Sequence, residues 1–173
     1  MPSTFRWTGA ALAALFWTAS LTPAQGANPK PAAATAPRLA SGQAAGTLTV
    51  DGKAIKLAYA AGFVDQSDKD KPVVLLITDQ PVPAAGWTSH SDLMPYHMDH
   101  RFQGLVLRLD QSRKLIGADY YDGTFPTSTS GYFVVDMKGP AGKALVGSAH
   151  STPAAAAGSH GVKADVTFRA DLK

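Results

Sequence analysis

Apolar and polar residues alternate over short stretches through most of the chain after residue 45. The clearest case is the last stretch, residues 162–172, where Val166 and Phe168 share one face and Lys163 and Arg169 share the other. Alternation with a period of two residues predicts a β-strand with one face in the core and the other in water. Similar patterns predict strands at residues 46–50, 54–63, 104–110, 114–121, 132–137 and 143–149.

One stretch breaks this alternation. Residues 73–77 are five consecutive large apolar residues, Val-Val-Leu-Leu-Ile, and three of them are β-branched. A short apolar run with this enrichment, bounded by turn signals, favours a strand that is covered on both faces. Residues 72–78 are therefore predicted to form the central strand of the core.

The predicted strands are joined mostly by short turns. Asp51-Gly52 lies between two alternating stretches and is a strong hairpin signal, because primed turns need positive φ. The chain also contains no Glu, a strong helix former. The pattern predicts an all-β fold, either an antiparallel sandwich or a meander barrel of about eight strands.

The longest irregular segment, about residues 80–103, leaves from the end of the predicted central strand. Loops of this length inside a compact domain are usually functional or contain structure of their own. Ser89 and Asp92 resemble a capping box, which predicts one short helical insertion here. Pro95 limits that helix to a turn or two unless it falls in the first turn.

The N-terminal residues predict export. Arg6 precedes an apolar stretch at residues 7–21, and Ala24 follows, which is the order found in a signal peptide, here residues 1–24. The stretch is short against the roughly 20 residues of a membrane span, although an uncleaved membrane anchor is the alternative interpretation. Residues 25–44, rich in Pro and Ala, predict a disordered linker. Residues 45–173 then form a single β-domain with no stable membrane span after signal removal.

Charge and cysteine content narrow the class of protein. Of the 16 Lys and Arg residues, Arg6, Lys30 and Arg38 precede residue 45, which leaves 13 against 13 Asp in the predicted domain. A nucleic-acid-binding domain should show a basic face, and this balance argues against that class. The chain has no cysteine, so the domain would depend on its core without disulfides in a periplasmic or secreted location.

Three of the five histidines lie in the insertion, at His90, His97 and His100. Imidazole is a good ligand for zinc or copper, and open sites often use three protein ligands. A divalent-metal-binding protein or metal-dependent hydrolase is therefore one hypothesis. The spacing matches no established zinc signature, however, and surface histidines are the alternative.

Aromatic side chains also gather in the insertion, and we consider Trp87, Tyr96 and Phe102, with Asp79 at the strand exit, as binding residues. Aromatic residues with polar tips suit contacts with a protein, peptide or sugar, although they can also cap the end of a core. No Gly-x-Ser-x-Gly elbow or cysteine nucleophile is present, so we assign no catalytic residue.

Residues 46–52 (GTLTVDG) and 73–83 (VVLLITDQPVP), with Tyr59, Gly104 and the strand around Val166, resemble an uncharacterised family of exported bacterial β-domains. The resemblance covers most of residues 46–170 and implies the fold, but it carries no function and no catalytic residue. The histidines of the insertion are not part of it.

These observations predict an exported, non-enzymatic β-domain of the bacterial envelope. It would be a binding or structural module that acts through the insertion at residues 80–103 on an unknown protein or ligand. No cofactor is expected unless the histidines hold zinc or copper.

Overall fold

The computed structural model describes residues 39–124, 126–129, 131–138, 142–158 and 160–172. The predicted signal peptide and most of the predicted linker therefore lie outside the described residues. The strands are β1 (Gln43–Val50), β2 (Lys53–Val64), β3 (Val73–Thr78), β4 (Gly104–Leu109), β5 (Leu115–Tyr121), β6 (Thr127–Ser128), β7 (Phe133–Met137), β8 (Ala144–Ser151) and β9 (Lys163–Asp171). The short helices are the 3₁₀ helix η1 (His90–Leu93), α1 (Met94–Met98) and α2 (Pro153–Ala157).

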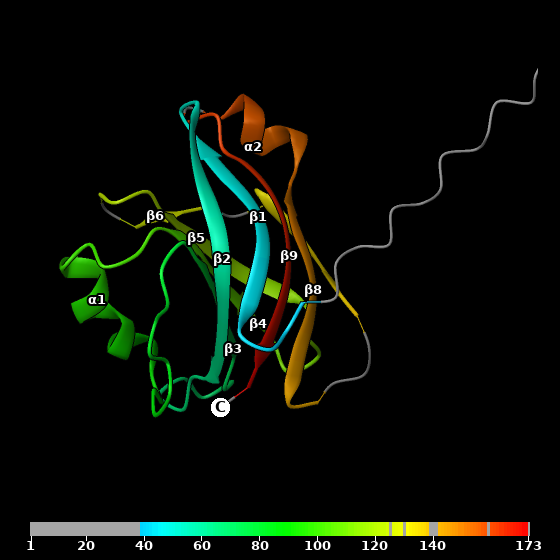
Figure 1. Cartoon of the computed structure of the whole chain (residues 1–173). Helices are drawn as coiled ribbons and strands as arrows, with labels where there is room; N and C mark the ends of the chain where they lie inside the picture. Colours follow the sequence, from blue (N-terminus) through cyan, green and yellow to red (C-terminus); the bar gives the residue numbers. More distant parts are fainter. Residues whose placement is uncertain (1–38, 125, 130, 139–141, 159, 173) are drawn as a thin grey trace, which may run out of the picture. The chain divides into compact units, whose positions relative to one another are not determined.

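All nine strands belong to one antiparallel sheet in the order β6-β5-β4-β3-β2-β1-β9-β8-β7. The sheet curls into a half-barrel (Figure 1). The predicted all-β antiparallel fold with one short helical insertion is thus confirmed. The sheet has nine strands rather than about eight, because Thr127 and Ser128 form β6 in a stretch expected to be a turn. A single curled sheet corresponds to the barrel alternative more closely than to a two-sheet sandwich.

Strand β3 is buried along its whole length, as its unbroken apolar run predicts. It pairs with β2 on one side and β4 on the other. Leu75 and Ile77 face the inside of the half-barrel, while Val74 and Leu76 face outward. Both sets of side chains are covered, so this strand needs apolar residues on both faces.

Two apolar clusters follow from this arrangement. The inner cluster fills the half-barrel with alternate residues from β1 to β5 and from β7 to β9, joined by Ala155 and Val162. The outer cluster joins the outward side chains of β2 to β5 to residues of the insertion, and consists of Phe63, Val74, Leu76, Ala84, Leu93, Phe102, Val106 and Tyr121. The insertion, which includes η1 and α1, therefore covers the outer face of the sheet beside β2, β3 and β4 (Figure 1).

The predicted helix forms where its capping signals indicated. The Ser89 hydroxyl accepts a hydrogen bond from a backbone N–H of η1, while the Asp92 carboxylate accepts from the Ser89 N–H. Pro95 lies in the first turn of α1, where its missing N–H removes no helical hydrogen bond. None of the described helices is long and apolar enough to span a membrane.

Candidate functional site

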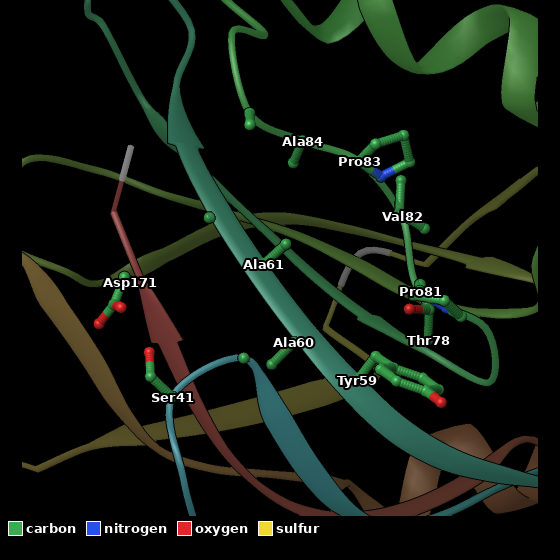
Figure 2. A pocket seen from close by; sticks show the side chains of 13 residues that line it. Ser41, Tyr59, Ala60, Ala61, Thr78, Pro81, Val82, Pro83, Ala84 and Asp171 are labelled. Carbon is green, nitrogen blue, oxygen red and sulfur yellow. The ribbon is translucent and has the colours of Figure 1, made fainter.

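A groove of about 310 Å³ crosses the outer side of β2 at the point where the insertion leaves β3. We call it the β2 groove. Figure 2 shows β2 along its floor, the segment at residues 81–85 on one side, and Ser41 with Asp171 on the other. The groove is lined by Ser41, Gly42, Tyr59, Ala60, Ala61, Gly62, Thr78, Pro81, Val82, Pro83, Ala84, Ala85 and Asp171.

The floor of the groove depends on an irregularity between β1 and β2. The pairing register of the two strands shifts between Gln43 and Gly46 of β1. At the same level of the sheet, the inward and outward alternation of the β2 side chains reverses. Leu57 and Ala60 both belong to the inner cluster, whereas Tyr59 is 40% exposed. With strict alternation along the predicted strand at residues 54–63, Tyr59 would share the face of Leu57. The irregularity therefore turns an expected core tyrosine into an exposed wall of the groove.

The opposite wall is held in place by prolines. Pro81 and Pro83 have no backbone N–H and a fixed φ, so this segment cannot pair with the sheet as a further strand. Val82 and Ala84 pack against the outer cluster, with Ala84 only 3% exposed. The segment is thus anchored to the sheet through two small side chains while its backbone stays apart from β2.

Hydrogen bonds hold the insertion at its neck and at its middle. At its neck, the Asp79 N–H donates to the Gln103 carbonyl at 2.9 Å, and the Gln103 N–H donates to the Asp79 carboxylate at 2.6 Å. Farther along, the carboxylate of Asp65, at the end of β2, accepts from the backbone N–H of His90 at 3.1 Å and from the Ser67 hydroxyl at 2.6 Å. Burial alone would raise the pKa of Asp65, but these hydrogen bonds hold it below its usual value.

The four residues predicted to bind a partner lie around the insertion and not in the groove. Trp87 packs edge-on against Phe63 at 5.7 Å between ring centroids, and against Tyr96 at 5.1 Å. Phe102 is 3% exposed and stacks obliquely on Tyr121. The Asp79 carboxylate accepts the hydrogen bond at the neck. In this arrangement the four side chains attach the insertion to the sheet.

The three insertion histidines have separate environments. His97 is buried edge-on against Tyr121 at 4.9 Å, and burial together with nearby His100 lowers the pKa of His97. The His90 ring is partly buried, while His100 is exposed just after α1. Among the described residues, no group of three or more His or Asp side chains is arranged to hold a metal ion. The metal hypothesis gains no support from this geometry.

The residues that do line the groove carried weak signals in the sequence. Ser41 lies in the segment interpreted as linker, and Tyr59 and Asp171 lie in predicted strands with no feature that marks them as site residues. Only the long irregular segment after the predicted central strand marked this region as unusual. The groove arises where four segments distant in sequence meet, at residues 41–42, 59–62, 78–85 and 171, so no single motif encodes it.

The groove offers apolar walls, an exposed aromatic ring and a carboxylate. Among its described lining residues, Asp171 has the only charged side chain. The Thr78 hydroxyl is 2.7 Å from the Gln80 carbonyl, to which it donates. The described lining residues include no histidine, lysine or cysteine. A cleft with apolar walls and a few polar groups has the composition typical of a ligand-binding site.

Comparison with protein-family models, with curated proteins and with solved structures found no match to this chain.

Proposed function

We propose that this chain is an exported, non-enzymatic binding domain of the bacterial envelope, and that the β2 groove is its binding site. The observation that carries the proposal is the groove itself, an apolar cleft of about 310 Å³ between β2 and the proline-bearing start of the insertion. Small-molecule sites are typically clefts of this kind, of about 300–1,000 Å³ with few polar groups. The expectation of export comes from the signal-like residues 1–24 and the Pro/Ala-rich residues that follow.

The groove is preformed, which favours a binding role. Its floor belongs to a long central strand, and its far wall is held by Pro81, Pro83 and the hydrogen bonds between Asp79 and Gln103. A ligand would therefore order few groups of the protein on binding, and less of the interaction free energy would be lost to conformational entropy.

The lining indicates the chemistry of the ligand. The exposed Tyr59 ring and the flat faces of Pro81 and Pro83 suit a planar or compact apolar group. At the opposite rim, Asp171 suits a positive charge, and the Ser41 hydroxyl can accept or donate a hydrogen bond. We propose that the groove takes an aromatic or apolar group that carries a cation, either on a small molecule or on a side chain of a peptide.

A titration followed by amide chemical shifts tests this proposal. The probes are a panel of aromatic amines and matched aromatic carboxylates, with tryptamine and indole-3-propionate as the reference pair. We expect the amines to shift the amides of residues 59–62 and of Val82, Ala84 and Ala85, and the carboxylates to shift them several-fold less. Ala61→Leu, which places a larger side chain on the groove floor, should remove these shifts.

Ile116→Ala is a matched control, because Ile116 is exposed on β5 and does not line the β2 groove. This variant should bind the amines as the parent does. The proposal would fail if no member of the panel shifted the groove amides, or if Ala61→Leu bound as tightly as the parent while keeping the fold.

A further inference from the structure

The β2 groove has two chemically different ends. Tyr59 pairs with Thr78, the last residue of β3, so it lies at the end of the groove where the insertion leaves the sheet. At the other end, Gly62 forms an isolated bridge with Leu172, which places the neighbouring Asp171 there. The aromatic ring and the carboxylate therefore lie at opposite ends of the groove (Figure 2).

The length of the groove follows from the strand that forms its floor. Tyr59 and Gly62 are three residues apart in β2, and each strand residue adds about 3.3 Å, so the two ends are about 10 Å apart. Between the ends, the lining consists of small or apolar side chains, among them Ala61, Val82 and Pro83. The groove thus has an apolar middle of fixed length between an aromatic end and an anionic end.

Both edges of β2 are already occupied along the groove. Residues Tyr59–Val64 pair with β3 on one edge. On the other edge, the Ala60 N–H donates to the Gly42 carbonyl at 3.0 Å, and Gly62 bridges Leu172. A peptide that binds by strand addition needs free N–H and C=O groups along an edge. The groove therefore presents side-chain surfaces, which favours a small molecule with an apolar chain over an extended peptide.

The charge of the lining selects a cation at one end only. Asp171 is exposed and is the only charged residue among the described lining residues. Ser41, on the same rim (Figure 2), can accept a hydrogen bond from an ammonium group. At the other end, Tyr59 offers an aromatic face to a planar ring. A ligand can reach both ends only if its ammonium group lies about 10 Å from its ring, the length of three strand residues.

We propose that the β2 groove binds elongated arylalkylamines, with the aromatic ring at Tyr59 and the ammonium group between Asp171 and Ser41. The apolar spacer of the ligand then covers Ala61 and the wall formed by the insertion. Because the groove must first be a binding site, this proposal rests on the proposed function. It adds that the distance between ring and cation decides which amines bind tightly.

A series of phenylalkylamines and matched phenylalkanols tests the proposal. The pairs have ethyl, hexyl and octyl spacers, and the extended hexyl spacer matches the length of the groove. Dividing the Kd of each alcohol by the Kd of its amine separates the contribution of the charge from that of the apolar chain. We expect a ratio of about two for the ethyl pair and about ten for the hexyl pair. The octyl pair should show no further increase.

Two variants separate the two ends of the groove. Asp171→Asn should remove the advantage of phenylhexylamine over phenylhexanol while leaving the affinity for phenylhexanol unchanged. Tyr59→Leu should weaken both members of the pair equally, because the contact between the rings is lost. Asp165→Asn is the matched control, since Asp165 is exposed on the same strand as Asp171 but does not line the groove. This variant should bind every probe as the parent does.

This proposal and the proposed function can fail separately. If no probe shifted the groove amides, both would be overturned. A ratio that was equal at every spacer length, or that Asp171→Asn left unchanged, would overturn the arylalkylamine assignment and leave the groove as a binding site. Tight binding of an extended tripeptide with a free N-terminus, without any dependence on spacer length in the amines, would overturn it in favour of a peptide ligand.

Discussion

The two faces of strand β3 are covered in different ways. Its inner side chains belong to one cluster with alternate residues of seven other strands, so many segments contribute to it. Its outer face is covered by residues of one inserted segment between β3 and β4. The inner cluster is therefore expected to open only with global unfolding, whereas the outer cluster can open locally if the insertion detaches. Neighbouring leucines of the same strand make this comparison testable.

Leu75→Ala should have the largest effect. Leu75 is fully buried in the inner cluster, and removing its side chain leaves a cavity that the paired strands cannot close. We expect a loss of about 3–5 kcal/mol in the free energy of unfolding, measured by urea denaturation. Amide exchange should accelerate throughout the sheet. An effect confined to residues near the insertion would contradict the assignment of a single cooperative inner core.

Leu76→Ala should cost less and act locally. Leu76 is equally buried, but its neighbours include Leu93 and Phe102 of the insertion, which can move toward the space left behind. We expect a loss of about 2–3 kcal/mol in the free energy of unfolding. The amide exchange rate should increase most at residues 89–102. Equal costs and identical exchange patterns for the two leucine variants would show that both clusters open together.

Asp65→Ala should detach the insertion without removing apolar contacts. The buried Asp65 carboxylate accepts hydrogen bonds from His90 and Ser67, and its loss leaves their donors without that acceptor. We expect a loss of about 1–3 kcal/mol, measured by urea denaturation. Asp70→Ala, in the exposed part of the same loop, is the matched control.

The lowered pKa of Asp65 also predicts a pH dependence. This carboxyl binds its proton more weakly in the folded state than in the unfolded state, where its pKa is near 3.8. Its contribution to the free energy of unfolding is therefore complete above pH 3.8 and is lost as the pH falls through the lower pKa of the folded state. The difference in stability between the parent and Asp65→Ala should therefore shrink in strong acid. A difference that stayed constant down to the acid transition would contradict this role.

Protonation of His97 should have the smallest effect on stability, and this effect should appear near neutral pH. Burial and the nearby His100 lower its pKa below 6.5, so the folded state holds the neutral ring and the unfolded state binds the proton more readily. Stability should thus fall as pH decreases through about 6.5. Exchange protection of the insertion should decrease in that range in the parent but not in His97→Phe. His150→Asn, exposed on β8, should behave as the parent does.

The sequence predicted some parts of the candidate site better than others. The long irregular segment after β3, which the sequence analysis identified, contributes Pro81 and Pro83 to one wall of the β2 groove. The choice of Trp87, Tyr96, Phe102 and Asp79 as binding residues rested on residue type, and in the structure these side chains contact the sheet or the neck of the insertion. Aromatic residues serve both roles, and only their neighbours in space distinguish an anchor from a binding surface.

The sequence by itself determined most of the strands of this protein, the burial of β3 on both faces and the short capped helix. These depend on the period of apolar residues and on local turn and capping chemistry, which involve residues close together in the chain. The tertiary structure decided which edges stay unpaired, where β2 changes its alternation, and which distant residues share a cavity. The β2 groove joins Ser41, Tyr59, Pro83 and Asp171. This site has no local pattern, because it depends on how the sheet curls and on contacts between segments far apart in the sequence.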